Sequence, residues 1–481
     1  MKKWFFLPTA LLLAAGSAPA AQIDVHGDLN NRFMLYTNQA QFFNGAVADV
    51  NPAVTNRLDK RDIEESWGEI KYRLWVEGST HEGKVKGVYG IELGAIRFGN
   101  QGTSVGRSTG GGFSGDGVNI ETRWAYVDIQ LPGVERKARF KVGLLPYSLN
   151  SFLWTETAMG VVFDGAAGKD VGYQLAWIRG KESFNATSDD SLFEDVDALS
   201  ARVDFKPVEN SKLGLFALWQ TSNPSQAAPA PGDPDPRRIT SQTYLLKAFG
   251  NVDLDIVSLG TDGSFTLPTG FGNAFINWDL IYQTGSVDNA VFTETASGLG
   301  RTGDFDLSAW LAHVDAGATV GRTRLTYTGW YASGDDNPLD SDFEGFLATD
   351  VDRADSIILF EGGYTDDTYF TERPYLLDKG LILNKLAVDH KATEKLAVGG
   401  ALLYLMAAED VAIGGGKKSD KIGTEIDAYM SYKLFPNVEV AVNAGYLFAD
   451  DAVDAFEVGV QRDGKADTDI FRSTARIRYT F

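Results

Sequence analysis

Charged residues that alternate with apolar ones are the residues of this chain that could do chemistry. Near the C-terminus, Arg472, Arg476 and Arg478 share one face of an extended segment, and Ile477 and Tyr479 share the other. Side chains of a strand alternate between its two faces, so this spacing separates a charged face from an apolar face. The same parity rule applied to other segments gives a set of inward basic residues. The set is Lys71, Arg73, Arg139, Lys141, Arg202, Arg322, Arg324, Arg472, Arg476 and Arg478.

Two kinds of chemistry suit these bases. Guanidinium and ammonium groups bind carboxylate or phosphate solutes, and arginine can do so through two hydrogen bonds. They can also pair with acids on the same face and so hydrate and stiffen a polar wall. The acids that parity places on that face are Glu69, Glu77, Glu92, Asp204, Asp279, Glu425 and Asp427. Both interpretations stay open at this point.

A long acidic segment at 333–380 is the second candidate site. Its first part carries Asp335, Asp336, Asp340, Asp342 and Glu344. Oxygen-rich spacing of this kind could bind calcium, but the glycine and terminal glutamate of an EF-hand loop are missing, so a solvated acidic surface is the alternative. If the segment folds inward, its acids would face the wall arginines and create a transverse field.

Composition argues against catalysis and cofactor binding. The chain has no cysteine and only four histidines, His26, His81, His313 and His390, which lie far apart. No nucleophile stands at a telling distance from a histidine and an acid, so we expect no enzyme, no metal and no cofactor. The net charge of −21 argues against a nucleic-acid partner.

The N-terminus indicates export. Two lysines, an apolar stretch and the small residues Ala18 and Ala20 predict a signal peptide over residues 1–20, which leaves a single domain at 21–481. The longest later apolar run covers only residues 396–408, which is shorter than the roughly 20 residues that a membrane helix needs.

Alternation over segments of about ten residues predicts an all-β fold, a transmembrane antiparallel β-barrel. Connections alternate in length, which is typical of short periplasmic turns and long extracellular loops. Short turns are expected near 79–83, 132–137, 165–170, 207–211, 266–272, 316–318, 390–395 and 434–437. Long loops are expected near 37–65, 99–117, 146–158, 181–196, 221–251, 285–303, 333–380, 409–421 and 450–468. These connections give about 18 strands, with 16 as the alternative.

The end of the chain predicts how the barrel is assembled and closed. A last strand that contains Tyr479 and ends at Phe481 resembles the signal that the barrel assembly machinery recognises in outer-membrane proteins. Pairing of the first and last strands would bring Asp24 and Asp28 near Arg478 and Arg476.

Two segments resemble a known family. The sequence YASGDDNP occupies 331–338, and GTEIDAY at 423–429 is followed by GYLF at 445–448. Both are similar to the C-terminal half of the alginate-export family of outer-membrane proteins and related porins. The resemblance implies a barrel of sixteen to eighteen strands that passes solutes passively.

The expected function is that of a porin in the bacterial outer membrane, through which small hydrophilic solutes or ions diffuse. The alternatives are an export channel for an anionic polysaccharide and a barrel that sheathes a partner cytochrome. Expected partners are outer-membrane lipid and lipopolysaccharide, the barrel assembly machinery and, as in related porins, two further copies in a homotrimer. If Arg322 and Arg324 lie at the narrowest point, they should set an ion selectivity that depends on salt.

Overall fold

The computed structural model describes residues 22–38, 64–80, 82–99, 120–133, 138–181, 196–222, 238–239, 245–249, 252–292, 301–351, 353–359, 375–456 and 463–481. The predicted signal peptide therefore lies outside the described residues.

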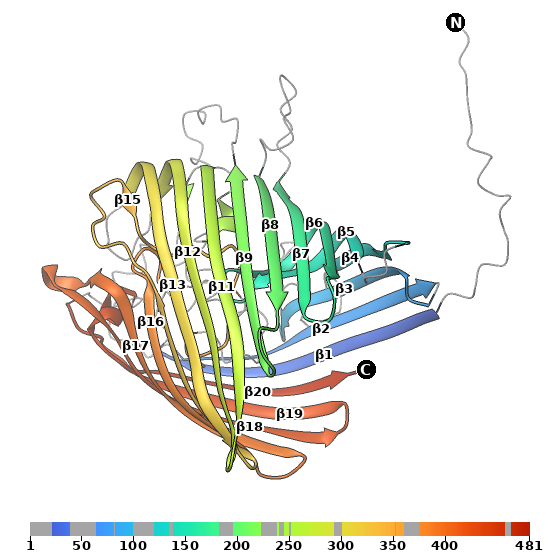
Figure 1. Cartoon of the computed structure of the whole chain (residues 1–481). Coiled ribbons are helices and arrows are strands. Elements are labelled where there is room, and N and C mark those ends of the chain that lie inside the picture. The colour runs from blue at the N-terminus through green and yellow to red at the C-terminus, as the bar shows by residue number, and fades with distance from the viewer. Residues whose placement is uncertain are drawn as a thin grey trace, which may run out of the picture.

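Within these residues, eighteen long strands form one continuous sheet (Figure 1). They are β1 (Gln22–Thr37), β2 (Glu64–Thr80), β3 (Val85–Arg97), β4 (Glu121–Gln130), β5 (Arg139–Asn150), β6 (Trp154–Ala166), β7 (Val171–Lys181), β8 (Val196–Phe205), β9 (Ser211–Ser222), β11 (Asp253–Thr269), β12 (Gly272–Phe292), β13 (Arg301–Val320), β14 (Thr323–Ala332), β16 (Leu381–Lys391), β17 (Leu396–Ala412), β18 (Lys418–Phe435), β19 (Val438–Ala449) and β20 (Ile470–Thr480). The short elements are β10 (Arg238–Ile239), β15 (Asp342–Phe343) and the 3₁₀ helices η3 (Leu246–Ala248), η6 (Gly414–Gly416) and η7 (Asp451–Phe456).

The sheet closes on itself. Each long strand pairs antiparallel with the next, and β20 pairs with β1 from Asp28↔Thr480 to Thr37↔Phe471. Closure leaves no unpaired sheet edge, which is what a spanning sheet needs in lipid. The predicted antiparallel barrel of eighteen strands is confirmed, and the alternative of sixteen is wrong.

The eight predicted short turns join strands at one end of the barrel, for example at 270–271 and 436–437. The turn expected at 316–318 lies instead at 321–322, because β13 continues to Val320. Two predicted long loops are wrong, because β5 and β6 are joined by residues 151–153 alone and β17 and β18 by 413–417. The first error has a physical reason. At the end of β5 the inward residues Leu145, Tyr147 and Leu149 are apolar and buried, so the expected rule of polar inside and apolar outside is reversed there.

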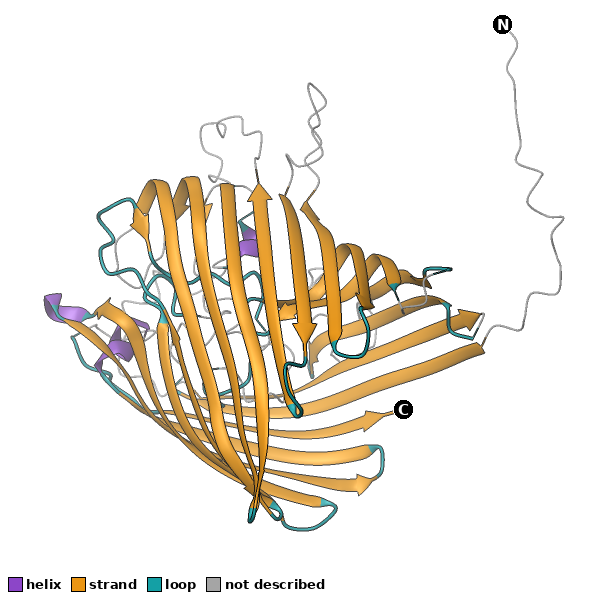
Figure 2. Ribbon diagram, viewed as in Figure 1, coloured by secondary structure: helices purple, strands orange, loops and turns teal. Residues whose placement is uncertain are grey.

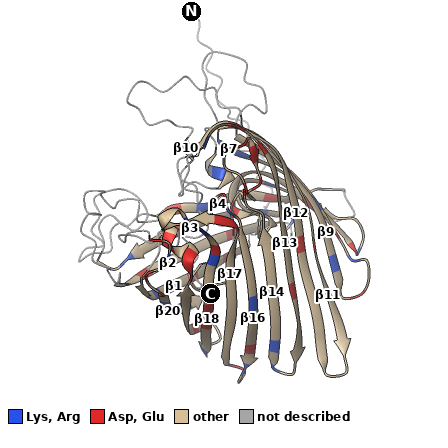
Figure 3. Cartoon of the chain, turned by 90° about the vertical axis from the view of Figure 1, so that its left-hand side faces the viewer, with Lys and Arg blue, Asp and Glu red and all other residues tan. Residues whose placement is uncertain are grey.

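Strands make up nearly all of the barrel wall (Figure 2). Their outward faces carry apolar side chains, as in β1, β16 and β20. Val25, Leu386 and Ile477, for example, are 50%, 60% and 48% exposed. An apolar belt on a closed barrel is the surface that a transmembrane β-barrel presents to lipid. Acidic and basic positions lie along the same strands (Figure 3). In the part of the chain that the structure describes, no helix is long and apolar enough to cross a membrane.

The seam between β1 and β20 matches the prediction in part. The Asp28 carboxylate accepts from Arg478 Nη2 at 2.5 Å and from Nε at 2.8 Å, as expected. Arg476 instead pairs with Glu439 of β19, and Asp24 lies below the β1–β20 ladder, opposite Glu77 of β2. The register explains the difference, since the residue opposite Arg476 is Arg32 rather than an acid.

The last residue, Phe481, packs in a fixed position against Gly27 of β1. The Gly27 amide donates to Phe481 O at 2.9 Å, and the Phe481 amide donates back to Gly27 O at 3.1 Å. The Phe481 ring lies over Gly27 so closely that a Cβ there would stand 2.3 Å from a ring carbon. Gly27 therefore provides the space for the terminal ring at the point where the barrel closes.

We predict that Gly27→Val displaces Phe481 and lowers the yield of folded barrel, because overpacking of this kind costs about 1–3 kcal/mol. The measurement is the heat-modifiable fraction on unheated gels after refolding in detergent. Gly78→Val is the matched control, since a Cβ at Gly78 of the neighbouring strand meets nothing within 4 Å. Equal folded yields for the two variants would show that the packing of Phe481 on Gly27 has no role in barrel folding.

Candidate functional site

The end of the β5–β6 hairpin leaves the barrel wall. β5 pairs with β4 only over Arg139–Leu144, and β6 pairs with β7 only over Gly160–Ala166. Among the described residues, 145–158 pair with each other along the strands, apart from one bridge between Trp154 and Asp350, and we call residues 145–159 the inward hairpin. Phe152 and Leu153 at its tip are fully buried. The inward hairpin therefore folds into the lumen, as its contacts with the opposite wall show.

Residues 333–351 and 353–359, which follow β14, form a second inward segment, the lumen loop. Its middle packs on the inner face of β9 and β12. The Leu347 amide donates to Gln283 Oε1 at 2.9 Å, and Gln283 Nε2 donates back to Leu347 O at 2.8 Å. Thr349 Oγ1 donates to Gln220 Oε1 at 2.8 Å. The described part of the acidic segment predicted at 333–380 therefore folds into the lumen.

The inward hairpin and the lumen loop form one packed body. The Thr349 amide donates to Leu153 O at 2.8 Å, and the Thr155 amide donates to Asp350 O at 3.0 Å. The Arg353 guanidinium lies over the Phe152 ring at 4.1 Å. Because these contacts join segments about 200 residues apart in sequence, each one positions the other.

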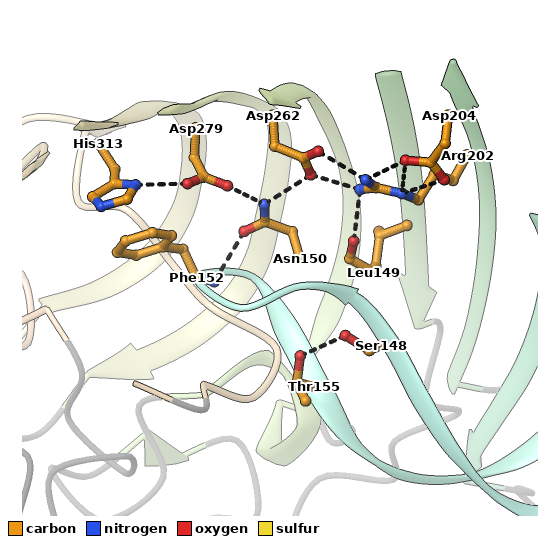
Figure 4. A network of polar contacts seen from close by, with 10 residues as sticks. All are labelled: Ser148, Leu149, Asn150, Phe152, Thr155, Arg202, Asp204, Asp262, Asp279 and His313. Atoms are coloured by element: carbon orange, nitrogen blue, oxygen red, sulfur yellow. Dashed lines mark hydrogen bonds and ion pairs between the residues drawn. The ribbon is translucent and has the colours of Figure 1, made fainter. Parts of the chain in front are cut away.

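A row of polar side chains fixes the hairpin to the wall (Figure 4). Asn150 Nδ2 donates to Asp279 Oδ1 at 2.6 Å, and Asp279 Oδ2 lies 2.7 Å from His313 Nδ1. On the other side, Arg202 Nη1 donates to Asp262 Oδ2 at 2.6 Å and to Leu149 O at 3.0 Å. The row thus links β8, β11, β12 and β13 to the hairpin. Arg202, predicted to line the pore, is engaged in this anchoring network together with Asp204.

On the facing part of the wall, three bases of β2–β4 gather around one acid. Glu92 accepts from Arg73 Nε at 2.6 Å and from Arg123 Nη1 at 2.7 Å, and Lys71 Nζ lies 3.4 Å from its other oxygen. Three cations therefore surround one carboxylate, and Arg73 and Arg123 keep 17% and 23% of their side-chain surface exposed. We call these four residues the Glu92 cluster.

Arg123 was not among the bases predicted from the sequence pattern. The ladder between β3 and β4 shifts register between Gly90 and Ile91, so that Arg123 lies outside the regular alternation of β4. No parity rule applied to a single strand could have found a bulged residue. Arg123 also lies 4.0 Å from Glu156 of the inward hairpin. Acids of both inward segments thus approach wall arginines, since Glu156 of this hairpin lies near Arg123, and Asp335 of the predicted set pairs with Arg301 of β13.

Most other predicted bases take part in ion pairs on the inner wall. Arg139 pairs with Asp128 at 2.7 Å, and Lys141 pairs with Asp164 at 2.5 Å. Arg472 is 1% exposed and stacks over Tyr36. These contacts fit the interpretation of a paired lattice, and whether the residues also select solutes stays a prediction.

Arg322 and Arg324 lie elsewhere than expected. Arg322 is in the β13–β14 turn rather than on a wall strand, and it donates to Ala392 O of another turn at 3.3 Å. Arg324 is exposed near the same end and stacks over Phe275 at 3.8 Å. Arg322 and Arg324 thus lie near the start of β14, whereas the lumen loop begins after its last residue, Ala332. The prediction that these two arginines lie at the narrowest point is therefore corrected.

The predicted acidic cluster is engaged with its own surroundings. Asp335 forms a buried ion pair with Arg301. Asn337 Nδ2 donates to Asp340 Oδ2 at 2.8 Å, and Asp342 belongs to β15, which pairs with β13. Partial burial together with the nearby Asp336, Asp340 and Asp342 raises the pKa of Glu344. Among the residues that the structure describes, no group of three or more acids or histidines has the arrangement of a metal site.

Comparison with known proteins supports the fold. No family model and no curated protein matches the sequence. The structure is similar to three Pseudomonas aeruginosa proteins, and each match covers 95% of this chain and 98% of the other chain. OccK9 (OpdG) has a sequence identity of 12% and a TM-score of 0.52. OccK2 (OpdF) in complex with glucuronate has an identity of 14% and a TM-score of 0.51, and OpdK with vanillate has an identity of 10% and a TM-score of 0.51. OpdK is described as an outer membrane protein.

The fold is therefore that of a bacterial outer-membrane β-barrel. Among known structures it is of the OccK and OpdK type, a likeness of fold at low sequence identity. The likeness gives no support to the narrower resemblance to the alginate-export family.

Asp350 joins a third segment to the packed body. Lys247 of η3 contacts its carboxylate, and its backbone bonds to the inward hairpin. Burial raises the pKa of Asp350 from 3.8 to about 6, although Lys247 opposes this shift, and Glu156 raises the pKa further. A raised carboxyl pKa means that the folded state binds the proton more tightly than the unfolded state does, so stability falls as the pH rises from about 4 to about 6.

We predict that Asp350→Asn removes this pH dependence. At 1.4 kcal/mol per pKa unit, a shift of about two units corresponds to on the order of 3 kcal/mol between pH 4 and pH 6. Hydrogen exchange of the amides of Leu153 and Thr155, corrected for the intrinsic pH dependence of exchange, measures it. The native protein should open more readily at pH 7 than at pH 4.5, and the variant should not. The same pH dependence in both proteins would contradict the prediction.

Proposed function

We propose that the chain is an outer-membrane porin that lets small hydrophilic solutes diffuse passively. The observation that carries this proposal is a closed barrel with an apolar outer belt and a charged inner wall that is partly exposed. Inward charges meet the solute, whereas outward side chains meet only acyl chains. The structural likeness to OpdK, an outer membrane protein, supports the proposed location.

Solutes would pass on the side of β2–β6. There Lys86, Arg123 and Lys141 keep 33%, 23% and 30% of their side chains exposed. On the opposite wall, Ser258 and Gln283 are fully buried beneath the inward segments. We infer a solute path that runs between the packed body and the Glu92 cluster.

This path would favour anions. The Glu92 cluster holds three bases and one acid, and a second acid, Glu156, lies at its edge. The OccK2 structure with glucuronate and the OpdK structure with vanillate contain small carboxylates, which makes such anions suitable probes. The acidic residues outside the lumen would attract cations in dilute salt. At physiological salt, their effect would be screened beyond a Debye length of about 8 Å.

Export of an anionic polysaccharide, which the resemblance to the alginate-export family would imply, is the second candidate. Its support is that glucuronate, the acid found with OccK2, is a uronate. The lumen loop crossing the barrel argues for small solutes over a polymer. Current recordings with added uronate oligomers separate the two candidates, since lasting block favours export and undisturbed current favours the porin.

Further parts of the proposal concern processing and partners. We propose that residues 1–20 are removed as a signal peptide and that 21–481 form the mature barrel. The strand ending at Phe481 would be recognised by the barrel assembly machinery. The outward belt would contact outer-membrane lipid and lipopolysaccharide, and native mass measurement in detergent tests for a homotrimer.

Conductance in planar bilayers tests the function, and neutralisation of two bases tests the path. Arg73→Gln with Arg123→Gln should shift the reversal potential toward cations, since one charge at about 8 Å in water contributes about 0.5 kcal/mol, roughly a twofold change in permeability ratio per charge. The control is Lys391→Gln with Lys395→Gln, two exposed bases at the β16–β17 turn. If both double variants behave alike, solutes do not pass the Glu92 cluster. If the native protein gives no current, the proposed function is wrong.

A further inference from the structure

The end of the lumen loop, residues 353–359, runs from the inward hairpin to the inner wall formed by β16, β18 and β20. At its start, Arg353 lies over Phe152 and donates to Ser151 Oγ at 3.3 Å, both in the inward hairpin. A few residues later the loop contacts β16, β18 and β20, which follow β13 and β14 around the sheet. We call residues 353–359 the crossing segment.

One side chain of the wall holds the far end of this segment. Glu425 of β18 is fully buried, and its Oε1 accepts from the amides of Ile357 and Ile358, both at 2.9 Å. Its Oε2 accepts from Ser356 Oγ at 2.6 Å. Three donors from consecutive residues therefore converge on one carboxylate, and hydrogen bonds to an ionised acceptor are about twice as strong as neutral ones.

Two weaker contacts assist. Arg472 Nη1 donates to Ile357 O at 3.2 Å, and Lys385 Nζ donates to Asp355 O at 2.6 Å. Both bind loop carbonyl groups, which water could satisfy as well. Loss of Glu425 would instead leave two amides and a hydroxyl without their acceptor in a buried place, at about 1–3 kcal/mol for each unsatisfied group. Movement of the crossing segment toward water would relieve that cost.

The barrel wall does not depend on this side chain. The backbone of Glu425 pairs with Leu403 of β17 and Leu447 of β19, so β18 is held on both edges by its ladders. The Glu425 carboxylate contacts the loop and, on its own strand, the side chain of Asp427. Its removal should therefore change the position of the crossing segment more than the barrel itself.

We propose that Glu425 is a positioning residue, which fixes residues 353–359 across the lumen and so sets the largest solute that the channel passes. The inference rests on the proposed porin function. It assigns the size limit to one contact between the wall and the loop, whereas the Glu92 cluster, on other strands, acts on charge.

The test compares Glu425→Ala with the native protein in single-channel recordings and in liposome swelling with neutral sugars of increasing size. Neutral sugars are used because removal of a charge does not by itself change their passage. The variant should show higher conductance and a size limit shifted to larger sugars. Glu425→Gln, which keeps one acceptor oxygen for the two amides, should restore most of the native limit.

Glu439→Ala is the matched control. Glu439 lies on the neighbouring strand β19 and pairs with Arg476 of β20, so this variant also removes one carboxylate from the inner wall. It should keep the native size limit. If Glu425→Ala has the same limit as the native protein, the inference is wrong while the porin function stands, and a native protein without current would overturn the function itself.

A second variant covers the case in which Glu425→Ala fails to fold. Ser356→Ala removes one of the three donors from the loop side and leaves every strand of the wall unchanged. It should shift the size limit in the same direction by a smaller amount. An unchanged limit in a folded Ser356→Ala barrel, together with a misfolded Glu425→Ala protein, would contradict the proposal by showing that Glu425 serves the wall.

Discussion

Pairing of every backbone amide across a closed ladder is the constraint on which the rest of this structure depends. In lipid, an unpaired strand edge would cost several kcal/mol per group, so β20 must return to β1. Closure at this circumference then creates a lumen wider than the wall side chains alone fill. The inward hairpin and the lumen loop occupy part of that space, and the charges on the wall face either these segments or the remaining path.

The two sides of the lumen differ because their charges have different partners. On β8 and β11–β13, Arg202, Asp262 and Asp279 are used to hold the inward hairpin. On β2–β4, three bases surround Glu92, and Arg73 and Arg123 among them stay partly exposed. Buried ion pairs contribute little net stability but are costly to break from one side, so the anchoring network favours one position of the hairpin. The proposed solute path beside the inward hairpin keeps the excess positive charge of the Glu92 cluster.

Alternation along single strands was enough to predict the barrel, its strand number and its eight short turns, because lipid outside and water inside impose the same period everywhere. It also predicted that Asp28 meets Arg478. It failed where the inside is not water. The inward hairpin was expected to be a long loop, since Leu145, Tyr147 and Leu149 reverse the usual polarity. Arg123 was missed through a bulge, and the role of Glu425 depends on a loop about 70 residues earlier in the chain. Contacts of that range are not encoded in local spacing.

The most direct test of this account asks which wall of the lumen meets the solution. The chain has no cysteine, so single cysteines can be placed at Lys86, Lys141 and Ser258 and exposed to a charged, water-soluble methanethiosulfonate reagent during current recording. The account predicts rapid modification and a stepwise fall in current at Lys86→Cys and Lys141→Cys, and no reaction at Ser258→Cys, which lies beneath the inward segments. Equal reaction at all three positions would contradict it, because solutes would then pass on both sides of the lumen.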